Sequence, residues 1–212
     1  MNDDRSIALP FEKRPKNLDG SYIGDVGFDP AGFSDEGVKP FTLKWYREAE
    51  LAHGRVGMLA VVGNFFPAWF HFPGNPAFGV PEDAYAALNP YTALSQIPSA
   101  ALPQIIFAAA FVELARYQRS IRGDKAPGDL GLGQTGYNPF GFEYTPEEYR
   151  EKQLQEIKHC RLGMLGALGI LLQAKYSGLG ITEQLGRSLS WLPEREILQG
   201  PGTLGDYFPP NI

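Results

Sequence analysis

Two stretches of the chain carry glutamate, histidine and arginine at one fixed spacing, each directly ahead of a long apolar run. The two sets are Glu50, His53 and Arg55 and, 106 residues later, Glu156, His159 and Arg161. The residues that follow also repeat, as "VGML" and "LGML". Carboxylate and imidazole groups can ligate metals, and a guanidinium can neutralise a carboxylate. The repetition predicts two copies of one structural unit, related by a pseudo-two-fold axis.

The charged residues of each copy are badly placed to pair with each other. Glu50 and Arg55 are five positions apart, which is about 140° around a helix and unlike the three or four positions of a good intrahelical pair. A pseudo-two-fold axis solves this problem if Glu50 meets Arg161 and Arg55 meets Glu156. Each carboxylate would then be neutralised by the guanidinium of the opposite helix.

The two histidines are not needed for this pairing. A single helical histidine is most often hydrogen-bonded in a core, but His53 and His159 occupy equivalent positions, which favours ligands. One interpretation is a di-iron carboxylate bundle, since Glu-x-x-His on two helices is half of its signature. That site needs a glutamate from each of two further helices, and the only other predicted helix contains Glu113 alone. The interpretation favoured by the residues is axial ligation of the magnesium of a chlorin, which needs one imidazole or one neutralised carboxylate per pigment.

Hydrophobic patterning predicts an all-α protein whose helices are joined by loops rich in glycine and proline. Thr145 is expected to cap the third helix, and Gly178 and Gly180 to end it. A short amphipathic piece, "ITEQLGRSL", is expected to follow. The predicted elements of this single domain, 1–212, are an N-terminal loop 1–44, helices 45–70, 101–121 and 146–176, loops 71–100 and 122–145, and a C-terminal tail 178–212.

Several features favour a membrane over a soluble helical protein, which is the competing interpretation because no run reaches 18 apolar residues. Aromatic pairs lie near both ends of the first helix, at 45–46 and 69–70. Residues 1–44 and 114–152 each carry six Lys or Arg, whereas 71–100 carries none and 178–212 two. The positive-inside rule then predicts three transmembrane helices, the first and third crossed as a pseudo-two-fold pair.

Composition excludes other classes of protein. The net charge of −5 disfavours a nucleic-acid partner. The single cysteine, Cys160, rules out a disulfide within the chain and a cysteine-based metal cage. No nucleophile–base pair or phosphate loop is present, so we expect no enzyme. The first residues lack an apolar signal core and an Arg/Ser-rich amphipathic pattern, so we expect no targeting segment in this chain.

At these motifs the chain resembles the light-harvesting chlorophyll-binding antenna family of plastids. "ELAHGRVGML" and "EIKHCRLGML" are similar to its first and third transmembrane helices, "FVELARYQ" to its middle helix, and "FDP" and "NPF" to its lead-in loops. The similarity covers about residues 20–180. "ALPFEKRPKNLDGSYIGDVGFDP" and His159 most resemble the red-lineage branch, which includes fucoxanthin–chlorophyll a/c proteins.

The resemblance implies a role for individual residues. The implied ligands of chlorophyll magnesium are Glu50, His53, Glu113, Glu156, His159 and Gln173, with Arg116 paired to Glu113. Two carotenoids would be anchored by the lead-in loops, at Phe28, Asp29 and Pro30 and at Asn138, Pro139 and Phe140. The alternatives are a plain ion pair for Glu113, a polar helix end for Gln173, and ordinary turn chemistry for the loops.

The implied function is an antenna subunit that absorbs light and passes excitation to a photosystem, with photosystem I favoured. The implied cofactors are chlorophyll a, chlorophyll c and a fucoxanthin-like xanthophyll, in a multi-pass protein of the plastid thylakoid membrane. Its partners would be the photosystem core, neighbouring antenna subunits and thylakoid lipids. Two alternatives stay open: a photoprotective quencher of the same fold, and the di-iron redox enzyme.

Overall fold

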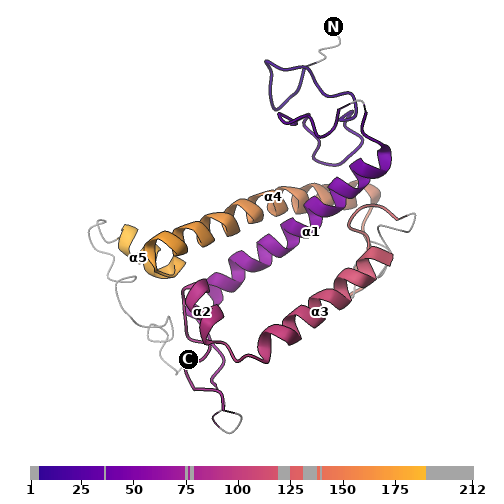
Figure 1. Cartoon of the computed structure of the whole chain (residues 1–212). Coiled ribbons are helices and arrows are strands. Elements are labelled where there is room, and N and C mark those ends of the chain that lie inside the picture. Colours follow the sequence, from indigo (N-terminus) through magenta and orange to yellow (C-terminus); the bar gives the residue numbers. More distant parts are fainter. Residues whose placement is uncertain are drawn as a thin grey trace. The chain divides into compact units, whose positions relative to one another are not determined.

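A computed structural model describes residues 5–35, 37–74, 76, 79–118, 125–130, 138 and 140–189. The described residues form five α-helices and one 3-10 turn, and the only extended pairing among them is an isolated bridge between Arg5 and Lys13. The elements along the chain are α1 (Pro40–Phe65), η1 (Phe66–Ala68), α2 (Pro90–Gln96), α3 (Ala101–Arg116), α4 (Pro146–Ser177) and α5 (Ile181–Leu189) (Figure 1).

The chain divides into two compact units. Unit 1 comprises Met1–Arg55 and Val112–Leu162, and unit 2 comprises Val56–Phe111 and Gly163–Ile212. Helices α1, α3 and α4 each contribute residues to both units. The motif Glu, His and Arg residues lie in unit 1, whereas the apolar runs that follow them lie in unit 2.

Close backbone approach joins α1 to α4 inside each unit, at small residues of the repeat. In unit 1, a Cβ added to Gly54 would lie 2.2 Å from the Cβ of Cys160. In unit 2, a Cβ on Gly57 would lie 2.9 Å from the backbone nitrogen of Met164, and one on Gly163 would lie 2.9 Å from that of Met58. Any larger residue would force the helices apart, so the repeated glycines set how closely α1 and α4 pack.

The three helices predicted from the sequence are present, and the first two have different ends. Helix α1 starts at Pro40 instead of residue 45, because a proline suits the first helical turn, where its missing N–H is not needed. It stops at Phe65, ahead of Pro67, and the chain continues as the 3-10 turn η1. Helix α3 ends at Arg116, and residues 117–118 continue as a π-turn.

The loop predicted for 71–100 contains a helix, α2, which is a correction to the sequence analysis. Asn89 caps it, with its side chain accepting hydrogen bonds from the backbone N–H groups of Tyr91 and Thr92, and Pro90 fills the first helical position. Asn89 Nδ2 also donates to the carbonyl of Ala174, and Tyr91 Oη to that of Leu171. These bonds attach α2 to the C-terminal end of α4 within unit 2.

Helix α4 has the ends that the sequence predicts. Thr145 Oγ1 accepts from the N–H of Glu148 at 3.3 Å, while Glu148 Oε2 accepts from the N–H of Thr145 at 2.9 Å, which is a capping box. At the other end Gly178 has φ +71, and its N–H bonds to the carbonyl of Ala174. Helix α5 follows at once, where the expected amphipathic piece lies.

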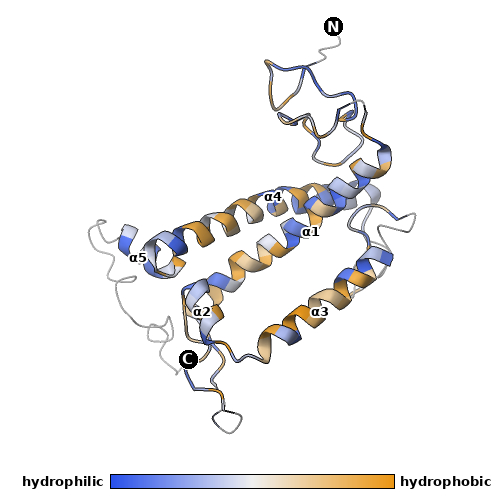
Figure 2. Cartoon of the chain, viewed as in Figure 1, coloured by the Kyte–Doolittle hydropathy of each residue, from blue (hydrophilic) through white to orange (hydrophobic). Residues whose placement is uncertain are grey.

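Helix α3 is hydrophobic along most of its length (Figure 2), and none of its residues is buried. Its exposed large side chains include Leu102, Ile105, Ile106, Phe107, Phe111, Val112 and Leu114. Taken singly, none of the described helices has both the length and the apolar character to cross a membrane; two bent pairs do together, α2 with α3 at 110° and α4 with α5 at 78°. Polar residues in the first halves of α1 and α4 explain why these helices fail alone. That each of the three long helices spans a membrane stays a prediction.

Candidate functional site

Two ion pairs link α1 to α4 inside unit 1, between the residues that the sequence analysis joined. Arg161 Nε lies 2.7 Å from Glu50 Oε1, and Arg55 Nε lies 2.8 Å from Glu156 Oε1. The four side chains are between 26% and 39% exposed, so the pairs are only partly shielded from solvent in the chain alone. Each helix therefore supplies the countercharge for the other.

Each of the two arginines has a second bond, to the carbonyl of a loop glycine. Arg161 Nη1 donates to Gly24 O at 2.9 Å, and Arg55 Nη1 donates to Gly128 O at 3.1 Å. Both glycines have positive φ, +75 and +81. A Cβ on Gly24 would lie 2.7 Å from a side-chain carbon of Ile157, so glycine also permits the close approach. The sequence analysis did not identify these bonds, because the motif gives no sign of which loop carbonyl lies opposite.

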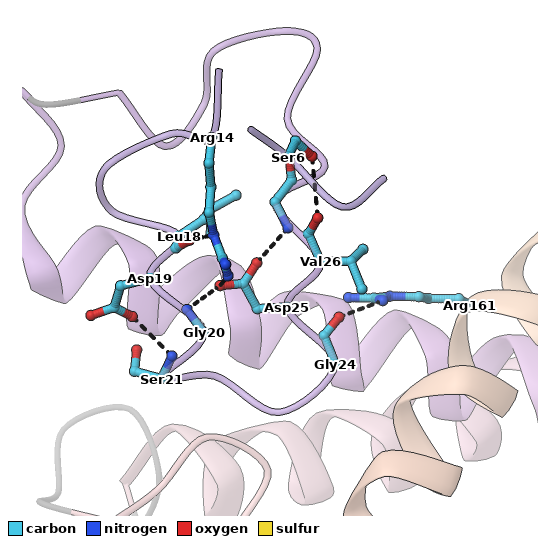
Figure 3. Close-up of polar contacts among 11 residues, drawn as sticks. Ser6, Arg14, Leu18, Asp19, Gly20, Ser21, Gly24, Asp25, Val26 and Arg161 are labelled. Atoms are coloured by element: carbon cyan, nitrogen blue, oxygen red, sulfur yellow. Dashed lines mark hydrogen bonds and ion pairs between the residues drawn. The ribbon is translucent and has the colours of Figure 1, made fainter. Parts of the chain in front are cut away.

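Asp25 holds the loop that presents the Gly24 carbonyl (Figure 3). Its side chain, 2% exposed, accepts from the N–H groups of Gly20 at 2.7 Å and Gly27 at 2.8 Å and pairs with Arg14 at 3.2 Å. Ser6 Oγ donates to the carbonyl of Gly27 at 2.6 Å. The N-terminal segment is thus ordered around one buried carboxylate, and Arg161 joins it to α4.

The two histidines have matching hydrogen bonds. His53 Nδ1 lies 2.8 Å from the carbonyl oxygen of Ala49, and His159 Nδ1 lies 2.7 Å from that of Gln155. A carbonyl can only accept, so Nδ1 carries a proton, and in the neutral form of the ring Nε2 has the lone pair. Both side chains are exposed. A carbonyl partner on the second ring nitrogen is the arrangement that orients metal-ligating histidines.

A third acidic site lies at the end of α3, also within unit 1. Arg116 Nη2 lies 2.6 Å from Glu113 Oε2, as the sequence analysis expected, and Glu113 is 55% exposed on its side chain. Arg116 Nη1 lies 3.6 Å from Glu48 Oε1, and the N–H of Gly128 donates to Glu48 Oε2 at 2.5 Å. Glu48, 3% exposed, was missed by sequence reasoning. Its position two residues before Glu50 was the available signal, but its partners Arg116 and Gly128 are identified only by the tertiary structure.

The two lead-in loops repeat one hydrogen-bond pattern. Asp29 Oδ1 accepts from the N–H of Phe33, and Asn138 Oδ1 accepts from the N–H of Phe142, each at 3.0 Å. Gly32 and Gly141 follow the same course with φ of +72 and +67. Both polar side chains are thus occupied in closing their own turns.

The exposed aromatic rings of the lead-in loops remain available as contact surfaces. Phe28 is 60% exposed and Phe140 83% exposed, and Pro30 is also exposed. Pro139, the remaining residue of the second predicted anchor, lies outside the described residues.

Burial alone would raise the pKa of Asp29, but hydrogen bonds from Ser34 and Phe33 outweigh it and lower this pKa.

Comparison with known proteins is decisive at this point. The profile of the family described as "Chlorophyll A-B binding protein" matches residues 14–175. The chain belongs to the chlorophyll a/b-binding, light-harvesting antenna family. Members of this family are antenna proteins and not enzymes.

Individual relatives come from both plants and algae. The chain is 37% identical to chlorophyll a-b binding protein 6, chloroplastic, of Arabidopsis thaliana, over 86% of this chain and 74% of the relative. It is 32% identical to the fucoxanthin-chlorophyll a-c binding protein, chloroplastic, of Chattonella marina var. antiqua, over 84% and 78%. It is 30% identical to photosystem I chlorophyll a/b-binding protein 5, chloroplastic, of Arabidopsis thaliana, over 92% and 80%.

The motif residues of this antenna-family chain suit chlorophyll in their donor chemistry. Magnesium takes nitrogen or oxygen donors, and His53 and His159 each direct a free Nε2 outward from an oriented ring. Glu156 has Oε1 on Arg55, and its Oε2 makes no hydrogen bond or ion pair within the described part of the chain. The charge of that carboxylate is neutralised while one oxygen stays open to a ligand.

The di-iron interpretation requires carboxylates and histidines gathered around one point. Within the described ranges, no three His, Cys, Asp or Glu side chains form a group that could hold a metal ion. Glu50 of α1 and Glu156 of α4 are instead each paired with an arginine of the opposite helix. The geometry therefore offers separate single-ligand sites.

Within the described part of unit 1, one cavity borders each of the motif glutamates Glu50 and Glu156. A cavity of about 470 Å³ is lined by Glu50 and Arg47 together with the predicted anchor residues Phe28 and Asp29. A second, of about 170 Å³, is lined by Glu156, Gln153 and again Arg47. The structure thus brings Glu50 and the first lead-in loop to one cavity. Gln173 lies apart in unit 2, exposed, and its side-chain amide makes no hydrogen bond among the described residues.

Proposed function

We propose that this chain is an antenna subunit that binds chlorophylls and carotenoids, absorbs light and transfers excitation to a photosystem. The observation that carries the proposal is the repeated site: two arginine-neutralised glutamates and two histidines oriented through Nδ1, on helices packed at glycines. Family membership supports the same function. Bound chlorophyll would supply the absorption, and the protein supplies single ligands at fixed places.

We assign magnesium ligation to six residues that the resemblance implied. They are Glu50, His53, Glu113, Glu156, His159 and Gln173. Histidine orientation and the ion pairs support the first five, whereas an exposed, unbonded amide supports Gln173. The two lead-in loops would each anchor a carotenoid through their exposed Phe28 and Phe140 rings, since Asp29 and Asn138 are already engaged.

The pigments proposed are chlorophyll a, chlorophyll c and a fucoxanthin-like xanthophyll. His159 and the likeness to a fucoxanthin-chlorophyll a-c binding protein support this choice. The photosystem proposed is photosystem I, supported by the likeness to a photosystem I chlorophyll a/b-binding protein. Its partners would be the photosystem core and neighbouring antenna subunits.

The proposed location is the plastid thylakoid membrane, crossed more than once. The uncovered apolar side chains of α3 support it, since such a surface calls for lipid or pigment contact. The Lys and Arg distribution supports an orientation with residues 1–44 and 122–145 on the stromal side and 71–100 in the lumen. Protease added to the stromal side should cut the first two segments, and cleavage confined to 71–100 would contradict this orientation.

The decisive experiment is an absorption spectrum with pigment analysis of the purified protein. Chlorophyll and carotenoid bands at a fixed ratio to protein are expected. A protein that carries iron and no chlorin would overturn the proposal in favour of the redox enzyme. Fluorescence lifetimes separate harvesting from quenching: the antenna keeps a long chlorophyll lifetime, whereas a quencher of the same fold shortens it.

A further inference from the structure

Arg47 distinguishes the Glu50 site from its pseudo-symmetric counterpart. Its Nη1 lies 3.0 Å from Glu50 Oε2, the oxygen that Arg161 does not contact. The Arg47 side chain is 13% exposed, and its guanidinium carbon lies 5.5 Å from the centre of the Tyr22 ring. The group is therefore fixed in place by a carboxylate and an aromatic ring, unlike a free surface cation.

Gln153 stands where the repeat would place a second Arg47, 106 residues further along. An amide carries no charge, and Glu156 Oε2 has no hydrogen bond or ion pair among the described residues. Glu50 is thus shared by two guanidinium groups, whereas Glu156 has one. The local formal charge is +1 around Glu50 and zero around Glu156.

This difference alters each carboxylate as a metal ligand. A guanidinium next to a carboxylate stabilises the anion and attracts its electron density, so a magnesium ion has to compete with it. Glu156 offers an oxygen with both lone pairs open. Glu50 offers only the remaining lone pairs of two engaged oxygens.

Space cannot account for weaker ligation at Glu50. The cavity beside Glu50 is the larger one, about 470 Å³ against about 170 Å³ beside Glu156. Arg47 lines both cavities, so its charge also borders the Glu156 side without contacting that carboxylate. The expected source of weaker magnesium ligation at Glu50 is therefore competition from the two guanidinium groups for its carboxylate oxygens.

We propose that Arg47 sets the strength of the chlorophyll site at Glu50 and makes it the more readily exchanged of the two carboxylate sites. This inference rests on the proposed function, because it needs Glu50 and Glu156 to be ligands. Arg47 acts through Glu50 as a positioning and tuning residue.

The test uses the full chain with its pigments and follows chlorophyll release after dilution into mild detergent. Glu50→Gln and Glu156→Gln, each lacking one chlorophyll, assign the two release phases. Glu50 chlorophyll should leave about tenfold faster than Glu156 chlorophyll, which corresponds to roughly 1.4 kcal/mol. Arg47→Gln should bring the two rates together, and Gln153→Arg should speed release at Glu156.

Arg47→Lys separates tuning from a structural role. Lysine keeps the charge beside Glu50, so the rate difference should persist, whereas loss of packing would affect Arg47→Lys and Arg47→Gln alike. Helix content by circular dichroism should match the parent protein in all variants.

The outcomes separate the inference from its foundation. If Glu50→Gln and Glu156→Gln keep all their chlorophyll, the ligand assignment of the proposed function fails. If each loses one chlorophyll but Arg47→Gln leaves the ratio of rates unchanged, only the role of Arg47 is overturned. A Gln153→Arg variant with unaltered release at Glu156 would overturn it as well.

Discussion

The Glu50 side and the Glu156 side of unit 1 correspond closely at the ion pairs and differ in the preceding helical turn. Both glutamates meet an arginine Nε within 2.8 Å, and both arginines reach a loop glycine carbonyl. In the preceding turn, the positions of Arg47 and Glu48 on α1 are occupied by Gln153 and Leu154 in the repeat on α4. The residue types are not repeated at these positions, and the contacts are not repeated either.

The difference coincides with what each helix must hold. Glu48 binds Arg116 of α3 and the backbone N–H of Gly128, so this residue links α1 to α3 and to the loop that follows α3. Leu154 has no charge to offer at the same position. The contacts between α1 and α4 are therefore the same on both sides of the repeat. The contacts differ at Glu48, where α1 binds α3.

The largest expected effect comes from removing one arginine of the cross-helix pairs. Arg55→Leu leaves Glu156 without a cation, whereas Arg161→Leu leaves Glu50 still bound to Arg47. We therefore expect Arg55→Leu to lower the free energy of unfolding by about 3 kcal/mol and Arg161→Leu by about 2 kcal/mol. Denaturant unfolding of the pigmented protein measures both. A larger loss of unfolding free energy for Arg161→Leu would mean that Arg47 does not neutralise Glu50 when Arg161 is absent.

Histidine substitutions test whether the equivalent residues His53 and His159 each bind one chlorophyll. His53→Leu and His159→Leu should each remove one chlorophyll per chain and leave the Glu–Arg pairs intact, because the rings do not contact those pairs. Pigment extraction gives the ratio. His71→Leu is the matched control and should keep every pigment. An unchanged ratio in either test variant would remove that histidine from the ligand set.

A smaller effect is expected when the asymmetric contact is abolished. Glu48→Leu gives α1 the residue that α4 has at this position, so Arg116 loses a partner and the Gly128 N–H loses its acceptor. We expect a loss of about 1–2 kcal/mol and faster hydrogen exchange at Gly128. Glu48→Gln, which keeps an acceptor oxygen, should protect that amide better. Equal protection in Glu48→Leu would show that α3 is held by other contacts.

The smallest effect compares the two lead-in loops at low pH. Asp29 has a lowered pKa in the folded protein, so its hydrogen bonds stabilise the turn above about pH 4 and are lost as pH falls through the folded value. Asn138 does not titrate. Relative to the Phe142 amide, the Phe33 amide should lose exchange protection below about pH 4. Asp29→Asn should remove that pH dependence, and its persistence would point to another carboxylate.

Much of this site was predictable because a repeat encodes it. The five-residue spacing of Glu50 and Arg55 forbids intrahelical pairing, and equal spacing in a second helix leaves the cross-helix arrangement as the simple solution. The caps of α4 follow from Thr145, Glu148 and Gly178 in the same way. These features depend on residues near one another in sequence or on an explicit duplication.

Features that depend on unrepeated tertiary placement were not predictable. The partners of Glu48 lie 68 and 80 residues away, and nothing in its own helix identifies them. Arg47 stands three residues before Glu50, a good intrahelical distance, but its pairing is informative only once Arg161 is seen on the other oxygen. Helix α2 has a recognisable Asn-Pro start and is simply too short for hydrophobic periodicity to reveal.

The bond from Arg161 to the Gly24 carbonyl spans 137 residues of sequence. Contacts of such separation form late, because a long stretch of chain must be ordered before its ends meet. Because Arg161 belongs to α4, the bond that holds the Gly24 carbonyl can form only when α4 is in place. The order of the segment around Asp25, and with it the Phe28 and Asp29 wall of the Glu50 cavity, therefore depends on a residue of α4.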